Sequence, residues 1–299
     1  MKTNKFIAIM LLGVLATACS KDGNNRLTLL AEGFTNGNSK VLINPDAIQD
    51  GSQWVVGEKV KVNNQTYTVA HDPDADYYYL EGTQDNGELL NVDKLAFYPG
   101  ESMPDKFDID IVGDTMLIIN SLSVRFNGDG SHEMAFPMVA KSAAGKSYLH
   151  FYHLSGGFRL TLRNNRASAV NVASVKVVAQ SDTAVQSLGY TKDNVTYTAK
   201  WAVQGPTVPS GRIGSGEPVD AKYCSEMYFD LVSSTNDDVT IAPGNDLKFC
   251  IPVTISSVAK LIVIGYASDG TELFQAHTSF ETPVPVERNH MYDLVPVSF

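Results

Sequence analysis

Residues 260–277, KLIVIGYASDGTELFQAH, decide the fold class of this chain. Two runs rich in apolar, β-branched and aromatic residues, 260–267 and 272–277, lie on either side of Asp269-Gly270. An Asp-Gly pair between two such runs is a strong signal of a β-hairpin, because tight hairpin turns need residues that tolerate positive φ. The stretch therefore predicts two antiparallel strands joined by a short turn.

The same pattern continues toward both ends of the chain. Runs with a period of two, separated by turns such as Asn63-Asn64 and Pro243-Gly244-Asn245, predict strands. Besides the hairpin, these strands are 26–34, 58–62, 65–70, 76–81, 94–98, 115–120, 157–162, 170–179, 195–201, 227–232, 246–254 and 291–299. Helical periodicity is scarce, which disfavours folds with crossover helices.

So many strands exceed one sandwich of about seven strands. We therefore predict an all-β chain with two tandem β-sandwich domains, 26–165 and 166–299. The expected join is the polar break Asn164-Asn165-Arg166-Ala167, and residues 204–220, rich in proline and glycine, are expected to form a long surface loop.

The N-terminus carries an export signal. Lys2 and Lys5 precede the uncharged apolar run 6–15, which is far shorter than the roughly 20 residues of a membrane-spanning helix. Small residues then lead to Cys19. This layout predicts a cleavable signal peptide over residues 1–18.

Residues 15–19, LATAC, resemble the bacterial lipobox, in which the cysteine is acylated. Lipidation is therefore expected at Cys19 and would anchor the chain in the outer membrane. An ordinary secretory signal, with Cys19 present by chance, is the alternative. Residues 19–25 are polar and predict a flexible tether, and Lys21-Asp22 resembles the tag that sends some lipoproteins to the cell surface.

Composition and motifs exclude several functions. The chain has 33 acidic and 23 basic residues, a formal net charge of −10, which argues against a nucleic-acid partner because phosphate binding needs clustered Lys and Arg. No Gly-x-Ser-x-Gly or His-Glu-x-x-His motif is present. His150 and His153, three apart on a strand, face opposite sides and cannot ligate one ion. We predict no enzyme activity, no cofactor and no metal site.

Two cysteines remain besides Cys19. Outside the cytoplasm, Cys224 and Cys250 point to a disulfide. The apolar residues near each cysteine take odd positions, which places both sulfurs on the other face of their strands. We expect a bridge across neighbouring strands outside the main core, with two free thiols as the alternative.

Five segments resemble the fimbrillin (Mfa-like) family of Gram-negative anaerobes. They are WVVGEKVKV (54–62), LAFYP (95–99), FPMVA (136–140), HFYHL (150–154) and ERNHMYDL (287–294). Together they extend over almost the whole mature chain. The family's fold, two transthyretin-like Greek-key β-sandwich domains, agrees with the two sandwiches expected from the strand pattern.

The resemblance implies a surface lipoprotein of type V pili, a fimbrial subunit or anchor in cell adhesion that pairs with related subunits by β-strand addition. In the family, an arginine-specific protease removes an N-terminal segment with the first strand, and a neighbour's strand fills the groove. Here Arg26 directly precedes the expected first strand, 27–34. The segment before Arg26 is shorter than in the family, and the chain stops at its final core strand. These features favour an anchor, tip or accessory subunit, with an unusual stalk subunit as the alternative.

Two further expectations concern sugars. Asp114-Thr115-Met116 and Asp182-Thr183-Ala184 resemble the O-glycosylation acceptor of exported proteins in such bacteria, so Thr115 and Thr183 are candidate glycosylation sites. The alternative function is a non-polymerising surface lipoprotein that binds a host or bacterial surface glycan or protein. Tyr77 and Tyr79, on one face of their predicted strand, or the loop 204–220 would supply that surface.

Overall fold

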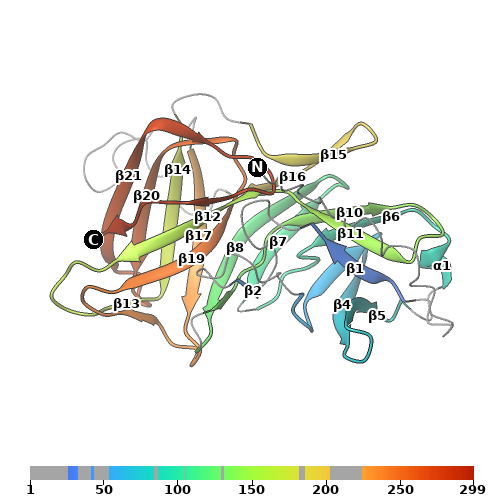
Figure 1. Ribbon diagram of the computed structural model, residues 1–299, viewed down its shortest axis with the longest axis horizontal. Coiled ribbons are helices and arrows are strands. Elements are labelled where there is room, and N and C mark those ends of the chain that lie inside the picture. Colours follow the sequence, from blue (N-terminus) through green and yellow to red (C-terminus); the bar gives the residue numbers. More distant parts are fainter. Residues whose placement is uncertain are drawn as a thin grey trace, which may run out of the picture.

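The computed structural model describes residues 26–32, 42–43, 54–83, 87–104, 106–128, 131–181, 186–202 and 224–299. Their regular secondary structure is almost entirely β-strand, which confirms the predicted all-β fold class (Figure 1). One helix, α1 (Gly87–Leu90), is present among them. No helix in this part of the chain is long and apolar enough to cross a membrane.

A closed barrel occupies the right-hand side of Figure 1. In order around the barrel, its strands are β1 (Thr28–Ala31), β11 (Tyr148–His153), β10 (Met138–Ser142), β6 (Lys94–Tyr98), β3 (Lys59–Val62), β4 (Gln65–Asp72) and β5 (Tyr77–Glu81). Asn63 and Asn64, between β3 and β4, have φ values of 46° and 68°, as a type I′ hairpin turn requires. β1 closes the barrel, pairing parallel with β11 and antiparallel with β5.

A ten-stranded sheet forms much of the rest of the molecule. Its main path is β15 (Gly189–Lys192), β16 (Val195–Trp201), β8 (Met116–Phe126), β17 (Cys224–Val232), β14 (Ser174–Gln180), β20 (Ser257–Tyr266) and β21 (Glu272–Pro285). Beside that path lie β7 (Phe107–Val112), β9 (His132–Glu133) and β2 (Leu42–Ile43). β20 and β21 form the predicted hairpin, and Gly270 in its turn has a φ of 82°.

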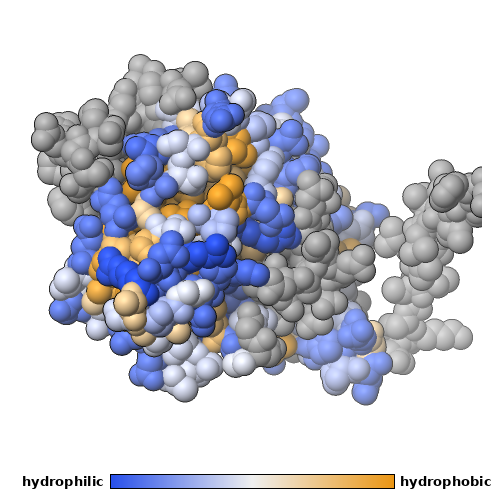
Figure 2. Space-filling model, turned by 60° about the vertical axis from the view of Figure 1, so that its left-hand side comes forward, coloured by the Kyte–Doolittle hydropathy of each residue, from blue (hydrophilic) through white to orange (hydrophobic). Residues whose placement is uncertain are grey.

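Two smaller sheets complete the described structure. In the first, β12 (Gly156–Arg163) pairs with β19 (Asp246–Val253), β22 (Met291–Asp293) and β23 (Val297–Ser298). In the second, β13 (Val170–Val172) pairs with β18 (Val239–Ile241). On the side that Figure 2 brings forward, apolar residues show between polar ones at the surface.

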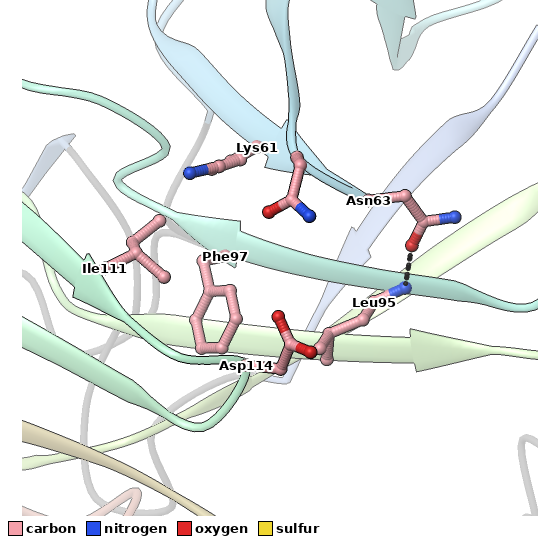
Figure 3. A pocket seen from close by; sticks show the side chains of 7 residues that line it. Lys61, Asn63, Leu95, Phe97, Ile111 and Asp114 are labelled. Carbon is pink, nitrogen blue, oxygen red and sulfur yellow. Dashed lines mark hydrogen bonds between the residues drawn. The ribbon is translucent and has the colours of Figure 1, made fainter.

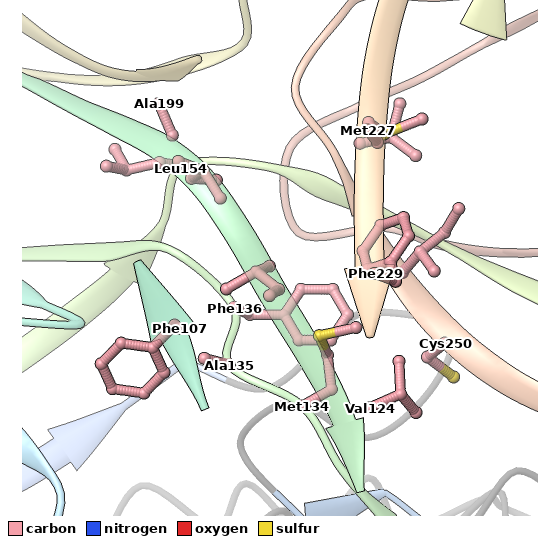
Figure 4. Close-up of a cluster of buried hydrophobic side chains, with 14 of the residues drawn as sticks. Phe107, Val124, Met134, Ala135, Phe136, Leu154, Ala199, Met227, Phe229 and Cys250 are labelled. Carbon is pink, nitrogen blue, oxygen red and sulfur yellow. The ribbon is translucent and has the colours of Figure 1, made fainter. Parts of the chain in front are cut away.

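One contiguous apolar core extends through the barrel and between the sheets. Phe229 on β17 and Cys250 on β19 both belong to this core, so the ten-stranded sheet and the β12–β19 sheet share it; Figure 4 draws both residues. Gly156 in β12 permits the close approach of the turn before β22, because a Cβ there would lie 2.7 Å from the backbone carbonyl oxygen of Glu287.

Strand pairing does not follow the boundary expected after residue 165. β12 precedes that position and pairs with β19, β22 and β23, which follow it. β8 also precedes it and pairs in parallel with β16 and β17. Partner choice depends on packing between distant segments, which local periodicity does not record. Pairing assigns β12 to the second half, and the division into two sandwich domains stays a prediction.

Candidate functional site

β1 lies between β5 and β11 and is held on one side by the backbone of β11. Thr28 donates its N–H to the carbonyl of Ser147 (2.9 Å), and Glu32 donates its N–H to the carbonyl of Phe151 (2.9 Å). Four residues of β1 are in register with β11. The two strands run parallel, so any strand taking this place in the same way runs in the direction of β11.

On the other side, the contacts with β5 are fewer. Leu80 donates its N–H to the carbonyl of Leu27 (3.0 Å). The N–H of Leu27 is bound by the hydroxyl oxygen of Thr83 (3.1 Å), which in turn donates to the carbonyl of Leu80 (2.7 Å). Thr83 thus supplies an acceptor where the β-ladder ends, a role that its sequence position did not reveal.

The side chains of β1 alternate between the barrel interior and the surface. Leu27 and Leu29 are 0% and 4% exposed, whereas Leu30 is 39% exposed. This is the period-two pattern expected of a strand with one buried face. Two leucine side chains therefore fill the groove that β1 occupies.

A carboxylate holds the C-terminal end of β1. Glu32 accepts a hydrogen bond from the N–H of His153 (2.6 Å) at Oε1, and the same atom forms an ion pair with Arg288. Arg288 also donates to the carbonyl of His153 (3.3 Å), and its guanidinium lies 5.4 Å from the ring centroid of Tyr190. The contact joins the first described strand to the turn before β22. Arg288 belongs to a segment that carried the family resemblance, but nothing in the sequence indicated its partner.

Arg26 holds the N-terminal end of β1. Its guanidinium forms an ion pair with Asp72 (3.2 Å) and lies 4.2 Å from the ring centroid of Tyr79. A hydrogen bond with Tyr77 raises the pKa of Arg26. The residue predicted to be cut is thus bound to β4 and β5 in the folded chain.

Aromatic side chains gather on the outer face of the barrel around β1. The rings of Tyr77 and Tyr79 have centroids 5.8 Å apart, which confirms that the two share a strand face. Tyr148, which is in register with Thr28, is 42% exposed. Tyr152 and Tyr190 are stacked 4.1 Å apart farther along β11.

A separate pocket of about 210 Å³ lies beside the β3–β4 turn (Figure 3). It is lined by Lys61, Asn63, Asn64, Leu95, Phe97, Ile111 and Asp114. Asn63 binds β6, since its Oδ1 accepts the N–H of Leu95 (2.9 Å). The volume is below the roughly 300–1,000 Å³ of drug-sized ligand sites, so the pocket suits only a smaller molecule.

Of three other predicted site residues, the described part of the chain includes one. Thr115 lies exposed in the turn between β7 and β8, next to Asp114. Cys19 and Thr183 lie outside the described residues. Lipidation and glycosylation at these positions stay predictions.

The cysteines require a correction. Cys250 is a free thiol, 0% exposed, on β19, and burial raises its pKa to about 12. The backbone of Cys224 is on β17, in the ten-stranded sheet, and its side chain lies outside the described residues. The expected placement of Cys250 outside the main core is therefore wrong, and a bridge with Cys224 stays a prediction. The last five residues of β19 are all buried, so alternation could not tell which face was the core.

One buried carboxylate of the barrel region, Glu58, is paired with two neighbouring side chains. Glu58 is 2% exposed and accepts hydrogen bonds from the hydroxyl of Tyr98 and from Lys106 Nζ (3.2 Å). Burial raises the pKa of Glu58. Within the described ranges, no group of three or more His, Cys, Asp or Glu side chains is arranged to hold a metal ion.

Comparisons with known proteins gave two negative results. No protein-family model matches the chain. No curated protein matches its sequence.

Solved structures of surface proteins show a distant similarity. A Bacteroides ovatus protein proposed to act in cell adhesion is 12% identical over 92% of this chain and 91% of that chain, with a TM-score of 0.39. A fimbrial protein of the same organism is 10% identical over 92% of this chain and 50% of that chain, with a TM-score of 0.30. A Bacteroides fragilis protein, also proposed to act in cell adhesion, is 10% identical over 90% and 91%, with a TM-score of 0.36. Scores at this level establish neither a shared fold nor a shared function.

Proposed function

We propose that this chain is a fimbrillin-like surface lipoprotein, a pilus subunit or pilus anchor in cell adhesion that assembles by β-strand addition. The observation that carries the proposal is the place of β1. The four-residue strand β1 begins two residues after Arg26 and closes the barrel, with Leu29 in the strand and Leu27 just before it both buried. Its removal would leave β5 and β11 with unpaired backbone groups and two empty side-chain positions, which is the kind of edge that captures a partner strand.

The N-terminal sequence supports the location. The lipobox and the polar tether favour acylation at Cys19 and attachment to the outer membrane. β1 starts soon after that tether, so a chain that keeps β1 stays attached to the membrane through it. Cleavage after Arg26 would separate the barrel from the lipid.

Mass spectrometry of the N-terminus of protein isolated from its own cells tests the proposal. An acylated Cys19 with Arg26 uncut identifies an anchor or a subunit that keeps its own β1. A new N-terminus at Leu27 would show that β1 is released from the lipid but stays in the barrel chain, which supports a processed, polymerising subunit whose β1 can leave the groove. An unacylated N-terminus close to residue 19, with no assembly into oligomers, would contradict the proposal.

The outer face of the barrel favours a second candidate function, binding of a surface glycan. Tyr77, Tyr79 and Tyr148 offer aromatic area with polar tips, a surface that suits sugar rings. A glycan array probed with the soluble chain tests it. Signal lost in Tyr148→Ala and kept in the control Tyr228→Ala, which lies on β17 of the ten-stranded sheet, supports this candidate, and an array without signal opposes it.

A further inference from the structure

The binding site of the Glu32 carboxylate is built by residues outside β1. It contains the N–H of His153 on β11 and the guanidinium of Arg288 in the turn before β22. The side chains of Glu32 and Arg288 are 15% and 27% exposed, so both are largely removed from water. A carboxylate placed here receives two hydrogen bonds on one oxygen.

The position of Arg288 is also set without β1. Its guanidinium lies over the ring of Tyr190, and that ring is stacked on Tyr152 at an angle of 7°. Burial and a hydrogen bond with Tyr152 raise the pKa of Tyr190 to about 12, so the ring stays neutral at physiological pH. Arg288 further donates to the carbonyl of His153. The cation would therefore remain at the end of the groove when β1 leaves.

A strand that binds in the groove without an acidic residue at this position gives the His153 N–H and the Arg288 guanidinium no carboxylate to bind. Partly buried charged donors that lose their partner are costly, and bonds to charged groups are about twice as strong as neutral ones. The groove thus distinguishes strands by their last residue as well as by the two inward side chains.

We infer that the groove selects an extended segment of another polypeptide with the pattern large aliphatic-x-large aliphatic-x-x-acid. Leu27, Leu29 and Glu32 show the pattern in the chain's own strand. The segment runs parallel to β11, and its carboxylate pairs with Arg288. This inference rests on the proposed function, because it names the partner of strand addition.

Peptide capture tests the inference. The chain carries Leu27→Ala and Leu29→Ala, which weaken its own β1 and leave the other strands of the groove intact. Two fluorescent peptides of residues 27–34 are compared by anisotropy, one with the natural sequence and one with Glu32→Gln. We expect the natural peptide to bind about tenfold more tightly, the ratio for roughly 1.4 kcal/mol. Adding Arg288→Met to the chain should abolish this preference.

Each outcome is informative. Equal binding of the two peptides, or a preference that persists in Arg288→Met, would contradict selection of an acidic residue by Arg288. Either result would still be consistent with strand addition. Capture of neither peptide by a chain with a native circular dichroism spectrum overturns strand addition itself.

A second measurement covers the case in which the weakened chain does not fold. In the otherwise natural chain, Glu32→Gln and Arg288→Met should each speed hydrogen exchange of the β1 amides about tenfold, and the double variant should add little. Unchanged β1 exchange, or fully additive effects, contradicts the inference.

Discussion

β1 and β14 each lie between two strands, yet they are held in different ways. β14 is in register with β17 and with β20 at seven positions each. β1 is in register with β11 at four positions and with β5 at one. In β14 five consecutive residues, 175–179, are buried, whereas in β1 only Leu29 is buried, together with Leu27 just before the strand. Two strands that each lie between two neighbours can therefore differ widely in how extensively they are paired.

The difference lies in what replaces the missing ladder. β1 has side-chain contacts at both ends, from Arg26 to Asp72 and from Glu32 to Arg288. These side-chain contacts can break one at a time, whereas the backbone hydrogen bonds of β14 to β17 and β20 break only when the sheet unfolds. We therefore expect β1 to open locally, with a smaller free energy than global unfolding.

The largest effect is expected in the sheet that contains β14. Phe229 is 0% exposed on β17, facing the shared core. Phe229→Ala should lower the free energy of unfolding by about 3–5 kcal/mol, through lost burial and a cavity. Urea denaturation measures it, and Tyr228→Ala, on the other face of β17, should cost much less. Equal losses would show that the core does not decide the stability of this sheet.

Acid should weaken the same shared core. His132 is 0% exposed, its Nε2 accepts the N–H of Cys250 (3.0 Å), and burial lowers its pKa from 6.5 to about 4. Between these values the unfolded chain binds the proton and the folded chain does not, so stability falls as pH drops from about 6.5 to 4. The loss attributable to His132 is roughly 3 kcal/mol.

Urea midpoints between pH 7 and pH 4 check the contribution of His132. His132→Gln keeps an acceptor for Cys250 and does not titrate, so its midpoint should fall less on acidification. A variant with the same pH dependence as the natural chain would assign the effect to other groups.

The third effect is local to β1. Leu29→Ala removes one of its two buried leucines and should favour opening of the strand by about 2 kcal/mol, roughly thirtyfold in exchange of the β1 amides. Leu30→Ala is the matched control, since Leu30 is the next residue and is 39% exposed. If the β14 amides speed up as much as those of β1, the two strands open together and the comparison fails.

Elements that depend on neighbouring residues could be predicted from the sequence. Asp269-Gly270 and Asn63-Asn64 specify their turns through local backbone preferences, and both hairpins are present. A first strand was expected over residues 26–34, and Thr28–Ala31 within that range form β1. These features need no information about the rest of the chain.

Features that depend on distant partners could not be predicted. Glu32 and Arg288 are 256 positions apart, and neither stands in a pattern that names the other. β8 pairs in parallel with β16 and β17, which no local period reports. Alternation failed for Cys250 because β19 is buried on both faces there. The strand β1 could therefore be predicted from the sequence, whereas the contact of the Glu32 carboxylate with Arg288 could not.

The smallest effect concerns the N-terminal end of β1. Asp72 pairs with Arg26, and both side chains are 23% exposed, so the pair is screened by water and salt and contributes little. Asp72→Asn keeps an oxygen for the N–H groups of Asp74 and Ala75 and removes the charge. Trypsin should then cut after Arg26 roughly two- to fivefold faster, because the arginine is released more often from β4 and β5. Asp74→Asn changes the same turn without touching Arg26 and should leave the rate unchanged, as measured by mass spectrometry of the N-terminal fragment. If both variants are cut at the natural rate, the contacts of Leu27 with Thr83 and Leu80, rather than the ion pair, protect this bond.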